Sequence, residues 1–508
     1  MRSVSRRLLL VWLLCIIAGT LAPYDFGAPG QAGGLHVFAT GSYERDPVHF
    51  ALNLLMFVPL GALLHHEARD RTISLPVVML LAGTAGLLIS SVVEYGQAFL
   101  PSRDSSLIDV VANSTGALIG VMADMKWGML VDAYLNRLRS RTSPAILIGI
   151  MSGFLAAELL LSGALQSRTR LSNWSLDYPL LIGNERTGDR PWRGRVFALT
   201  MTDAAMPLTS VRRFSRGESV ILPGSPIAQF NLTGASPYTD SAGNLPSLEW
   251  TEPRDALVEG GASLPHPWLQ SDGSASALAR RLRETNAFTL RVHCVTDDPD
   301  QQGPARIVSN SVSPLLRNFT MGQQGGDLVF RLRTPSTGVN GYPLEVSAPD
   351  VFSDDRPREI LITYDGATVL VALAHSDQVS RTALTPGSSA ILAMPFLKLN
   401  PAGLQLYELV YVATLSLIPA VLVAVFGRTR RHRYLLGAGW VLAFAVLLET
   451  TLVAASGRTF DWENVASTAA VAAAVLTLVG LALVPPDVPL RRPSAHPWWV
   501  SEARPHVS

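Results

Sequence analysis

The sequence predicts a multi-domain membrane protein with an α-helical polytopic membrane domain of about eight spans and an all-β sandwich outside the membrane. Three observations predict it. Two apolar stretches flank a polar middle. The polar middle contains short runs in which polar and apolar residues alternate, as half-buried strands do. Arginines accumulate in alternate loops between the apolar runs, which is the charge pattern of a membrane protein.

Composition excludes several classes of protein. The chain has 508 residues and a net charge of +1, so its overall charge argues against a nucleic-acid binder. It has two cysteines, Cys15 in an apolar run and Cys294 in the polar middle. A disulfide framework is therefore excluded.

Eight apolar runs account for the membrane part. The first, Leu8–Ala22, follows three arginines. We interpret it as an uncleaved helix rather than a signal peptide, because it has no convincing cleavage site and further spans follow. The second run, His49–Leu64, is short, because a span needs about 17–25 residues. The remaining spans are predicted at His49–Leu64, Pro76–Val93, Leu107–Ala123, Pro144–Leu165, Leu406–Phe426, Tyr434–Ala455 and Val465–Val484.

Loop charges predict the orientation. Arginine and lysine concentrate on the cytoplasmic side of a membrane. One set of loops is poor in them, with Arg45 and Arg103 alone. We therefore expect cytoplasmic termini and an extracytoplasmic segment over 166–400. The basic loops contain Arg2, Arg6, Arg7; Arg69, Arg71; Lys126, Arg137, Arg139, Arg141; Arg428, Arg430, Arg431, Arg433; and Arg491, Arg492, Arg504.

The segment from Glu94 to Gly120 is too polar for a lipid-facing helix and too apolar for a loop. Charged groups at a membrane boundary are costly unless they are paired, so they indicate a functional site by default. We expect a group of polar side chains to converge at the depth of the outer leaflet, and we predict that they bind a ligand. The group consists of Asn53, Glu94, Gln97, Arg103, Asp109 and Asn113.

Structural interpretations compete with this one. Glu94 and Arg103 would also serve as an ion pair that ties two spans together. Ser106 and Asp109 have the spacing of a capping box and would then only begin a helix. Asn53 and Asn113 would form hydrogen bonds between helices, and the G-x-x-x-G of Gly116 and Gly120 would allow close helix packing.

The polar middle predicts a β-sandwich, because several strand-length runs are separated by turn residues. The TYDGAT segment predicts a hairpin, since Asp-Gly supplies the positive backbone angles of a tight turn. No strong helical period is found there. The expected strands are Ala287–Val295, Ala305–Val312, Asp327–Thr334, Arg358–Gly366 and Ala367–Ser376.

Other candidate sites have simpler explanations. The His65-His66-Glu67 group has no known metal-binding spacing and is interpreted as a solvated helix end. Asp297, Asp298 and Asp300 are candidates for calcium in the sandwich, although acidic turns are common, and we predict no resident cofactor or metal. Core packing is expected for Trp174, Trp192 and Trp250 rather than stacking on sugars. No catalytic motif is found, so the sequence does not predict an enzyme.

Two stretches resemble known families. HFALNLLMFVPLG and EYGQAFLPSRDSSLIDVVANSTGALIG resemble the VanZ-like family of bacterial membrane proteins, which is named after a teicoplanin-resistance protein. The matching polar and small positions include Asn53, Phe57, Pro59, Gly61, Glu94, Gln97, Arg103, Ser105, Ser106, Asp109, Asn113 and Gly116. The resemblance implies a cell-envelope protein and a link to lipoglycopeptide resistance.

The polar middle is similar to concanavalin A-like and laminin G-like jelly-roll sandwiches through FTLRVHCV, ILITYDGATVLVAL and LLIGNERTGDRPWRGRVFALTMTDAAM. The last of these stretches usually ends such a sandwich, whereas here it comes first. The resemblance implies glycan binding, and the changed order leaves the position of a binding face open.

An internal echo suggests that the membrane part is duplicated. ETTLVAASGRTFDWENVASTAAVAAAV repeats part of the polar segment without a gap: Glu449, Arg458, Asn464 and Thr468 fall where Glu94, Arg103, Asp109 and Asn113 lie. Glu449, Arg458 and Asn464 are therefore a second candidate site. The expected organisation is a VanZ-like membrane domain over 1–143, a fifth span over 144–165, the sandwich over 166–400, a C-terminal membrane domain over 401–485 and a cytoplasmic tail over 486–508.

Three functions follow as hypotheses. The first is a non-enzymatic envelope protein that binds membrane lipid or a lipid-linked cell-wall precursor through the polar cluster, and glycan or another envelope component through the sandwich. The second is a membrane enzyme acting on polyprenyl-linked sugars with Glu94 or Asp109 as base. The third is an adhesin or scaffold in which only the sandwich functions.

Overall fold

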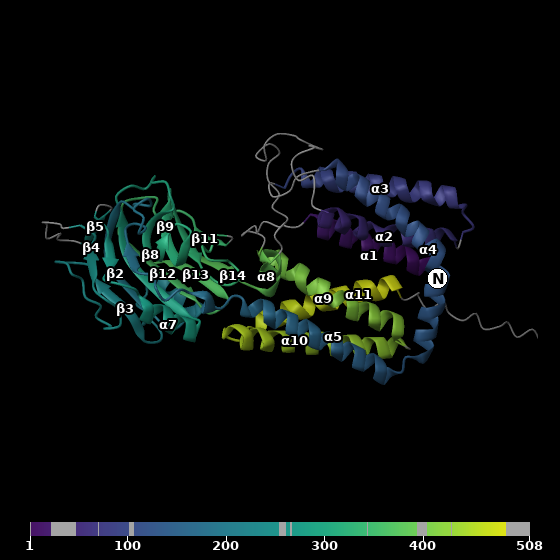
Figure 1. Cartoon of the computed structure of the whole chain (residues 1–508). Helices are drawn as coiled ribbons and strands as arrows, with labels where there is room; N and C mark the ends of the chain where they lie inside the picture. Colours follow the sequence, from purple (N-terminus) through teal and green to yellow (C-terminus); the bar gives the residue numbers. More distant parts are fainter. Residues whose placement is uncertain are drawn as a thin grey trace, which may run out of the picture.

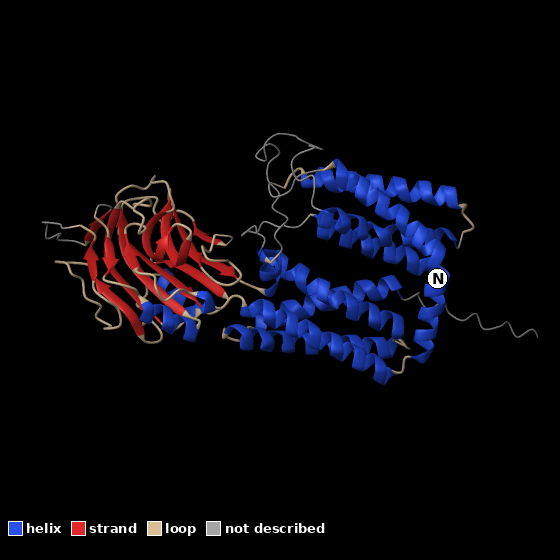
Figure 2. Ribbon diagram, viewed as in Figure 1, coloured by secondary structure: helices blue, strands red, loops and turns tan. Residues whose placement is uncertain are grey.

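The computed structural model describes residues 2–21, 47–69, 71–100, 106–252, 261–264, 267–342, 344–393, 404–427 and 429–483. Figure 2 shows the long helices gathered in one body and the strands in another. The multi-domain prediction is therefore confirmed. The long helices are α1 (Arg2–Thr20), α2 (Pro47–Arg69), α3 (Leu75–Gln97), α4 (Leu107–Arg141), α5 (Pro144–Ser167), α9 (Leu404–Phe426), α10 (Arg430–Ser456) and α11 (Trp462–Leu483).

The helices identify an integral membrane protein. Within the described residues, 7 helices are long and apolar enough to cross a membrane, which is one fewer than the sequence predicted. The apolar part of α1, Leu8–Ile17, is shorter than a span requires. The helix that contains the predicted fourth span is longer than that span, since α4 continues past Ala123 to Arg141 before Ser143 caps the next helix. No proline interrupts this extension.

The first four helices form one unit in which α2 and α4 approach very closely. A Cβ on Gly120 would lie 2.0 Å from the Val58 carbonyl oxygen, and one on Gly116 would lie 2.1 Å from that of Leu54. From the other side, a Cβ on Gly61 would lie 1.7 Å from the Ala117 oxygen. The expected role of the G-x-x-x-G pair in helix packing is thus observed.

Helices α5, α9, α10 and α11 form a second unit with its own apolar core. Phe444 of α10 is fully buried there and stacks on Trp440 at 4.7 Å between ring centroids. The two units lie side by side in Figure 1, and Leu8 of α1 packs against the cluster formed by Ala420 and Val479 of the second unit. One contiguous helical body results.

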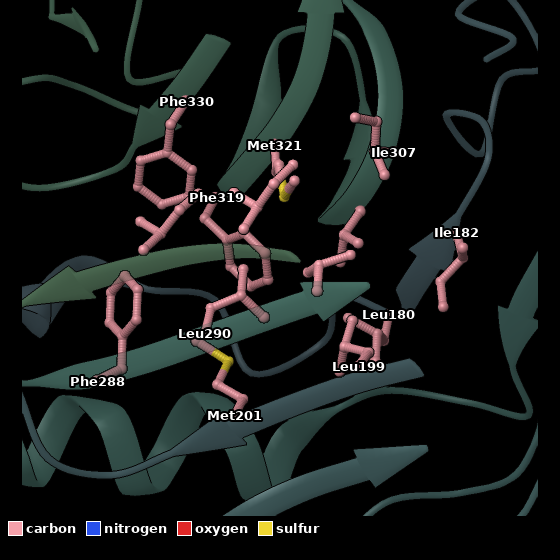
Figure 3. Packing of buried hydrophobic residues seen from close by; sticks show 14 of the residues in the cluster. Leu180, Ile182, Leu199, Met201, Phe288, Leu290, Ile307, Phe319, Met321 and Phe330 are labelled. Carbon is pink, nitrogen blue, oxygen red and sulfur yellow. The ribbon is translucent and has the colours of Figure 1, made fainter. Parts of the chain in front are cut away.

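The strands form two antiparallel sheets that pack face to face. One sheet has the order β11-β10-β9-β8-β1-β6-β4 and the other β14-β13-β12-β7-β2-β3, with β5 paired to β2. Figure 3 shows Phe288, Leu290, Phe319 and Phe330 of the two sheets meeting in the buried core. The strands are β1 (Leu180–Ile182), β2 (Gly194–Thr202), β3 (Pro226–Asn231), β4 (Leu248–Trp250), β5 (Ala262–Leu264), β6 (Leu269–Ser271), β7 (Phe288–Thr296), β8 (Ala305–Ser313), β9 (Leu316–Gln324), β10 (Asp327–Leu332), β11 (Glu345–Ala348), β12 (Arg358–Tyr364), β13 (Thr368–Leu373) and β14 (Val379–Ala383).

The predicted sandwich is confirmed, and so is the β12–β13 hairpin, in which Gly366 adopts a φ of 94°. The polar middle has no strong helical period in its sequence, yet it contains helices. Its described part holds three short α-helices, α6 (Leu208–Ser215), α7 (Ser276–Thr285) and α8 (Pro386–Leu392), and the 3-10 helix η1 (Leu171–Asn173). Helix α7 buries Leu278, Ala279 and Leu282 at helical spacing, but only three apolar positions carry the period, so it was hard to recognise.

The sandwich is docked onto the second helical unit, beyond one end of its helices (Figure 1). The side-chain amide of Asn286 donates to the Ser456 carbonyl at the end of α10. The Gly387 N–H of α8 donates to Glu408 of α9 over 2.9 Å. Because these bonds join segments far apart in the sequence, they fix the sandwich on the helices.

Candidate functional site

The carboxylate of Glu94 organises the link between α3 and α4. Glu94 lies in the last turn of α3 and is 1% exposed. Its Oε2 accepts the backbone N–H of Ser106 over 2.8 Å, and the Ser106 side chain in turn accepts the N–H of Ile108. Ser106 therefore caps α4, as the spacing predicted. A buried acid at the end of one helix thus holds the start of the next.

The other predicted residues have separate roles. Gln97 donates to the Thr20 carbonyl over 2.8 Å and ties α3 to the end of α1. Asn113 donates to Ser90 Oγ over 2.8 Å and joins α4 to α3, which is the structural alternative considered for it. Asn53 and Asp109 are half-buried on α2 and α4. Arg103 lies outside the described residues.

Glu449 of the second unit is enclosed by its own partners. It is 1% exposed in α10, and its carboxylate accepts from Arg458 Nη2 and Asn464 Nδ2, each over 2.5 Å. The backbone N–H of Asp461, the residue before α11, donates to Glu449 Oε1 over 2.9 Å. Three groups predicted as a second candidate site are thus in contact.

The two units share this local design. Each buried glutamate accepts the N–H of the residue that precedes the next long helix, and in both cases that residue lies 12 positions further along the chain. Burial follows the same register, offset by the 355 residues between Glu94 and Glu449. The residues buried at equivalent positions of α3 and α10 are Ala82 and Gly437, Gly86 and Val441, Ser90 and Ala445, Val93 and Leu448, Glu94 and Glu449, and Gln97 and Leu452.

One substitution changes the chemistry between the units. Asn464 donates to Glu449, whereas Asp109 occupies the equivalent place in the first unit. An ionised aspartate accepts hydrogen bonds and donates none. The second unit therefore has an amide donor to its buried glutamate at a position where the first unit has an acid.

Sequence reasoning missed polar groups inside the second unit. Glu158 of α5 is 6% exposed, and its Oε2 has no hydrogen-bond partner among the described residues. One turn further on, Ser162 Oγ lies 2.9 Å from the hydroxyl of Tyr411 on α9. The available signal was an acidic residue within an apolar run, as in AAELLL.

The interpretation of His65 and His66 as a solvated helix end was wrong. His65 Nδ1 lies 2.7 Å from Asp124 Oδ2 of α4, and the His65 side chain is only 13% exposed. His66 Nδ1 lies 3.6 Å from the other oxygen of the same carboxylate. Helix α4 supplies this partner because it runs alongside α2, a proximity that residue spacing does not reveal.

The sandwich candidates resolve into structural roles. Asp298 forms an ion pair with Arg193 at 3.2 Å, and Asp297 lies 3.9 Å from Arg195, so arginines face these carboxylates. In the described parts of the chain, no group of three or more metal-ligating side chains is found. The expected core packing is confirmed for Trp174 and Trp192, which are 2% and 0% exposed.

Comparison with known proteins identifies the first unit. No curated protein and no solved structure matches the chain. A family model described as VanZ/LLP1 matches residues 9–131, which run from α1 through most of α4. The match includes Glu94, Gln97, Asn113 and the close α2–α4 contact. Residues 9–131 of this chain therefore form a VanZ-like domain.

Proposed function

We propose that this chain is a non-enzymatic protein of the bacterial cell envelope. Its VanZ-like unit binds an anionic lipid or a lipid-linked envelope precursor at the outer leaflet, and its sandwich binds glycan or another envelope component. Both termini lie in the cytoplasm and the sandwich lies outside. A role in reduced sensitivity to lipoglycopeptides is consistent with the family.

The observation that carries the proposal is the buried carboxylate of Glu94 in a VanZ-like unit. Taking a charged acid out of water at a membrane boundary is costly, so a buried acid there indicates a functional site by default. Glu94 holds the start of α4 in place, and the short link that it closes contains Arg103. A guanidinium group suits phosphate and carboxylate headgroups. In this proposal Glu94 positions the link and Arg103 contacts the headgroup.

The second unit supports a division of labour. Arg458 neutralises the charge of Glu449 within the fold. Asn464, which donates to Glu449, lies where the first unit has Asp109. This arrangement stabilises a helix connection without an outside partner. Asp461 also lies 3.6 Å from Arg381 of β14, so the second unit carries the sandwich. We assign the ligand to the first unit because the VanZ-like match covers that unit.

The test is binding of purified full-length protein to anionic and polyprenyl-phosphate lipids. Arg103→Ala should abolish selective binding, whereas Arg458→Ala, the matched change in the second unit, should weaken stability and leave the affinity of the folded protein unchanged. Glu94→Gln keeps an acceptor for the Ser106 N–H and removes the charge, so it separates positioning from electrostatics. Lipid binding that is indifferent to Arg103→Ala contradicts the site.

The same preparation distinguishes the alternatives. Turnover of a polyprenyl-linked sugar, lost in Glu94→Gln, establishes the membrane enzyme instead. If the helices are replaced by unrelated spans and the effect on lipoglycopeptide sensitivity persists, the chain is a scaffold in which only the sandwich functions. Loss of the phenotype in Arg103→Ala, with normal insertion, supports the proposal over both.

A further inference from the structure

Arginines are buried on the outer face of one sheet of the sandwich. Arg331 follows Phe330 of the core in β10, so its side chain lies on the face opposite the core. Thr320 pairs with Arg331 across the strands and shares that face. Ser309 pairs with Thr320, so it lies on that face too. The Oγ of Ser311 lies 2.9 Å from the Oγ of Ser309, which places Ser311 there as well. Arg317 pairs with Ser311. Arg317 therefore belongs to the same face.

Positive charge exceeds negative charge at this place. Arg306 of β8 and Arg317 of β9 are each 1% exposed, and Arg331 is 9% exposed. Glu345 binds the guanidinium of Arg331, and Glu185, which is 0% exposed, lies 3.5 Å from Arg306 as an ion pair without a hydrogen bond. Two carboxylates thus face three buried guanidinium groups.

A fourth arginine lies at the margin of the cluster. The backbone N–H of Arg306 donates to the Arg190 carbonyl over 3.0 Å. The Arg190 side chain is 41% exposed and marks the solvent side. Its neighbour Asp189 is 50% exposed and 3.9 Å away, so solvent weakens that pair.

Arg317 has the least compensation. Its Nε and Nη1 atoms have no hydrogen-bond acceptor in the described part of the chain. Burial, together with Arg306 and Arg331 nearby, lowers the pKa of Arg317 to about 9, so it stays cationic at neutral pH. Burying a charge without a partner destabilises the fold. The hydroxyl of Thr320 on the same face also lacks a partner within those residues.

We propose that Arg306 and Arg317, with Arg331 and Arg190 beside them, bind an oxyanion. The ligand is the carboxylate of an acidic sugar or a phosphate ester, which share the planar or forked acceptor geometry that guanidinium groups recognise. Thr320 and the unpaired N–H groups supply the remaining contacts. This site gives the sandwich of the proposed function a defined ligand class, acidic envelope polymer, and the site itself does not depend on the lipid-binding unit.

The experiment measures thermal unfolding and binding by calorimetry on the full-length protein in detergent. The probes are glucuronate and glycerol 3-phosphate, with glucose and glycerol as neutral controls at constant ionic strength. An anion that binds the folded protein raises the unfolding temperature, and the rise grows with the logarithm of the anion concentration above its Kd. We expect at least one oxyanion to raise it and neither neutral probe to do so. The two oxyanions identify a carboxylate or a phosphate source.

Variants tie the effect to the cluster. Arg317→Met should remove the anion-dependent shift while leaving the anion-free unfolding temperature equal or higher, because an uncompensated buried charge is gone. Arg280→Met, on the exposed side of α7, is the matched control and should keep the full shift. Arg317→Lys keeps the charge without the fork and should weaken binding about tenfold.

Equal shifts with oxyanions and neutral probes overturn the proposal, as does an unchanged shift in Arg317→Met. If Arg317→Met does not fold, Arg317→Lys decides through its affinity. Lipid binding measured in parallel keeps the two proposals apart. Loss of lipid binding in Arg103→Ala with a normal oxyanion shift leaves the oxyanion site standing. Lipid binding that depends on Arg103, together with no oxyanion shift in the wild type, removes the oxyanion site alone.

Discussion

Glu94 and Glu449 occupy equivalent places in two helical units: each is buried in the helix before a link, and each accepts the backbone N–H of the residue that precedes the next long helix. The shared hydrogen bond gives the side chain at this position the same structural role in both units. In the second unit Arg458 neutralises it inside the fold. The common role is structural, and any ligand chemistry depends on what else surrounds the carboxylate.

The Glu449 cluster should be a strong determinant of stability. Glu449→Ala leaves the Arg458 guanidinium without its carboxylate, and breaking a buried pair in this way costs about 3–5 kcal/mol. Glu449→Gln should cost less because it keeps an acceptor for the Asp461 N–H. The measurement is unfolding by SDS titration in mixed micelles. A double-mutant cycle with Arg458→Ala gives the coupling, and additive single changes contradict the pairing.

The α2–α4 contact should not tolerate side chains. A methyl group on Gly120 would meet the Val58 carbonyl oxygen at 2.0 Å, so Gly120→Ala forces the backbones apart and should destabilise the VanZ-like unit by about 1–3 kcal/mol or more. Gly153 of α5 has nothing within 4 Å of such a methyl group. Gly153→Ala should therefore be neutral or stabilising, as expected for a helix interior. Detergent-phase unfolding compares the two variants, and equal effects reject the contact.

The sequence predicts the parts of this fold that repeat or alternate. Apolar runs located the long helices, and alternation with an Asp-Gly turn located β12 and β13. The echo of Glu94 in Glu449 was also visible, because both segments keep the same spacing. Contacts between distant segments were not visible. The pairing of His65 with Asp124 depends on α2 and α4 lying together, and the buried arginines of β8 and β9 depend on strand register, neither of which has a local sequence signal.

Acidification should weaken the sandwich through Asp203. Burial raises the pKa of Asp203, but the Ser225 N–H and the Arg281 guanidinium outweigh it and hold that pKa below the usual 3.8. A carboxyl whose pKa is depressed in the folded state stabilises the fold above its unfolded pKa, and this stability is lost as the pH falls through the folded value. We expect the loss below pH 3.8.

Asp203→Asn tests this dependence. The variant should be less stable than the wild type at pH 7, and the difference should shrink as the pH falls below 3.8, where the wild-type carboxyl becomes protonated. Unfolding can be followed through the intrinsic fluorescence of Trp174 and Trp192, which are buried in the sandwich core. Parallel pH curves for the two proteins rule out Asp203 as the source.

The docking of the sandwich should depend on Asn286. Its side chain accepts the Leu171 N–H over 2.8 Å and donates to the Ser456 carbonyl, so one amide joins the sandwich to the end of α10. Asn286 has a φ of 55°, which glycine adopts without strain, so Asn286→Gly removes the amide and spares the backbone. Hydrogen exchange should rise at the end of α10. The control is Arg381→Ala, since an ion pair at 3.6 Å between partly exposed side chains is worth about 0–1 kcal/mol.

The residues at which exchange rises show whether docking of the sandwich stabilises the Glu449 cluster. The link after Ser456 contains Arg458 and Asp461, and both contact Glu449. If docking supports that cluster, Asn286→Gly should speed exchange at Asp461 as well as at Ser456, because the link is held at both ends. Faster exchange confined to the sandwich, with the link unchanged, shows that the Glu449 cluster holds itself together. In that case the second helical unit supports the sandwich without being stabilised by it.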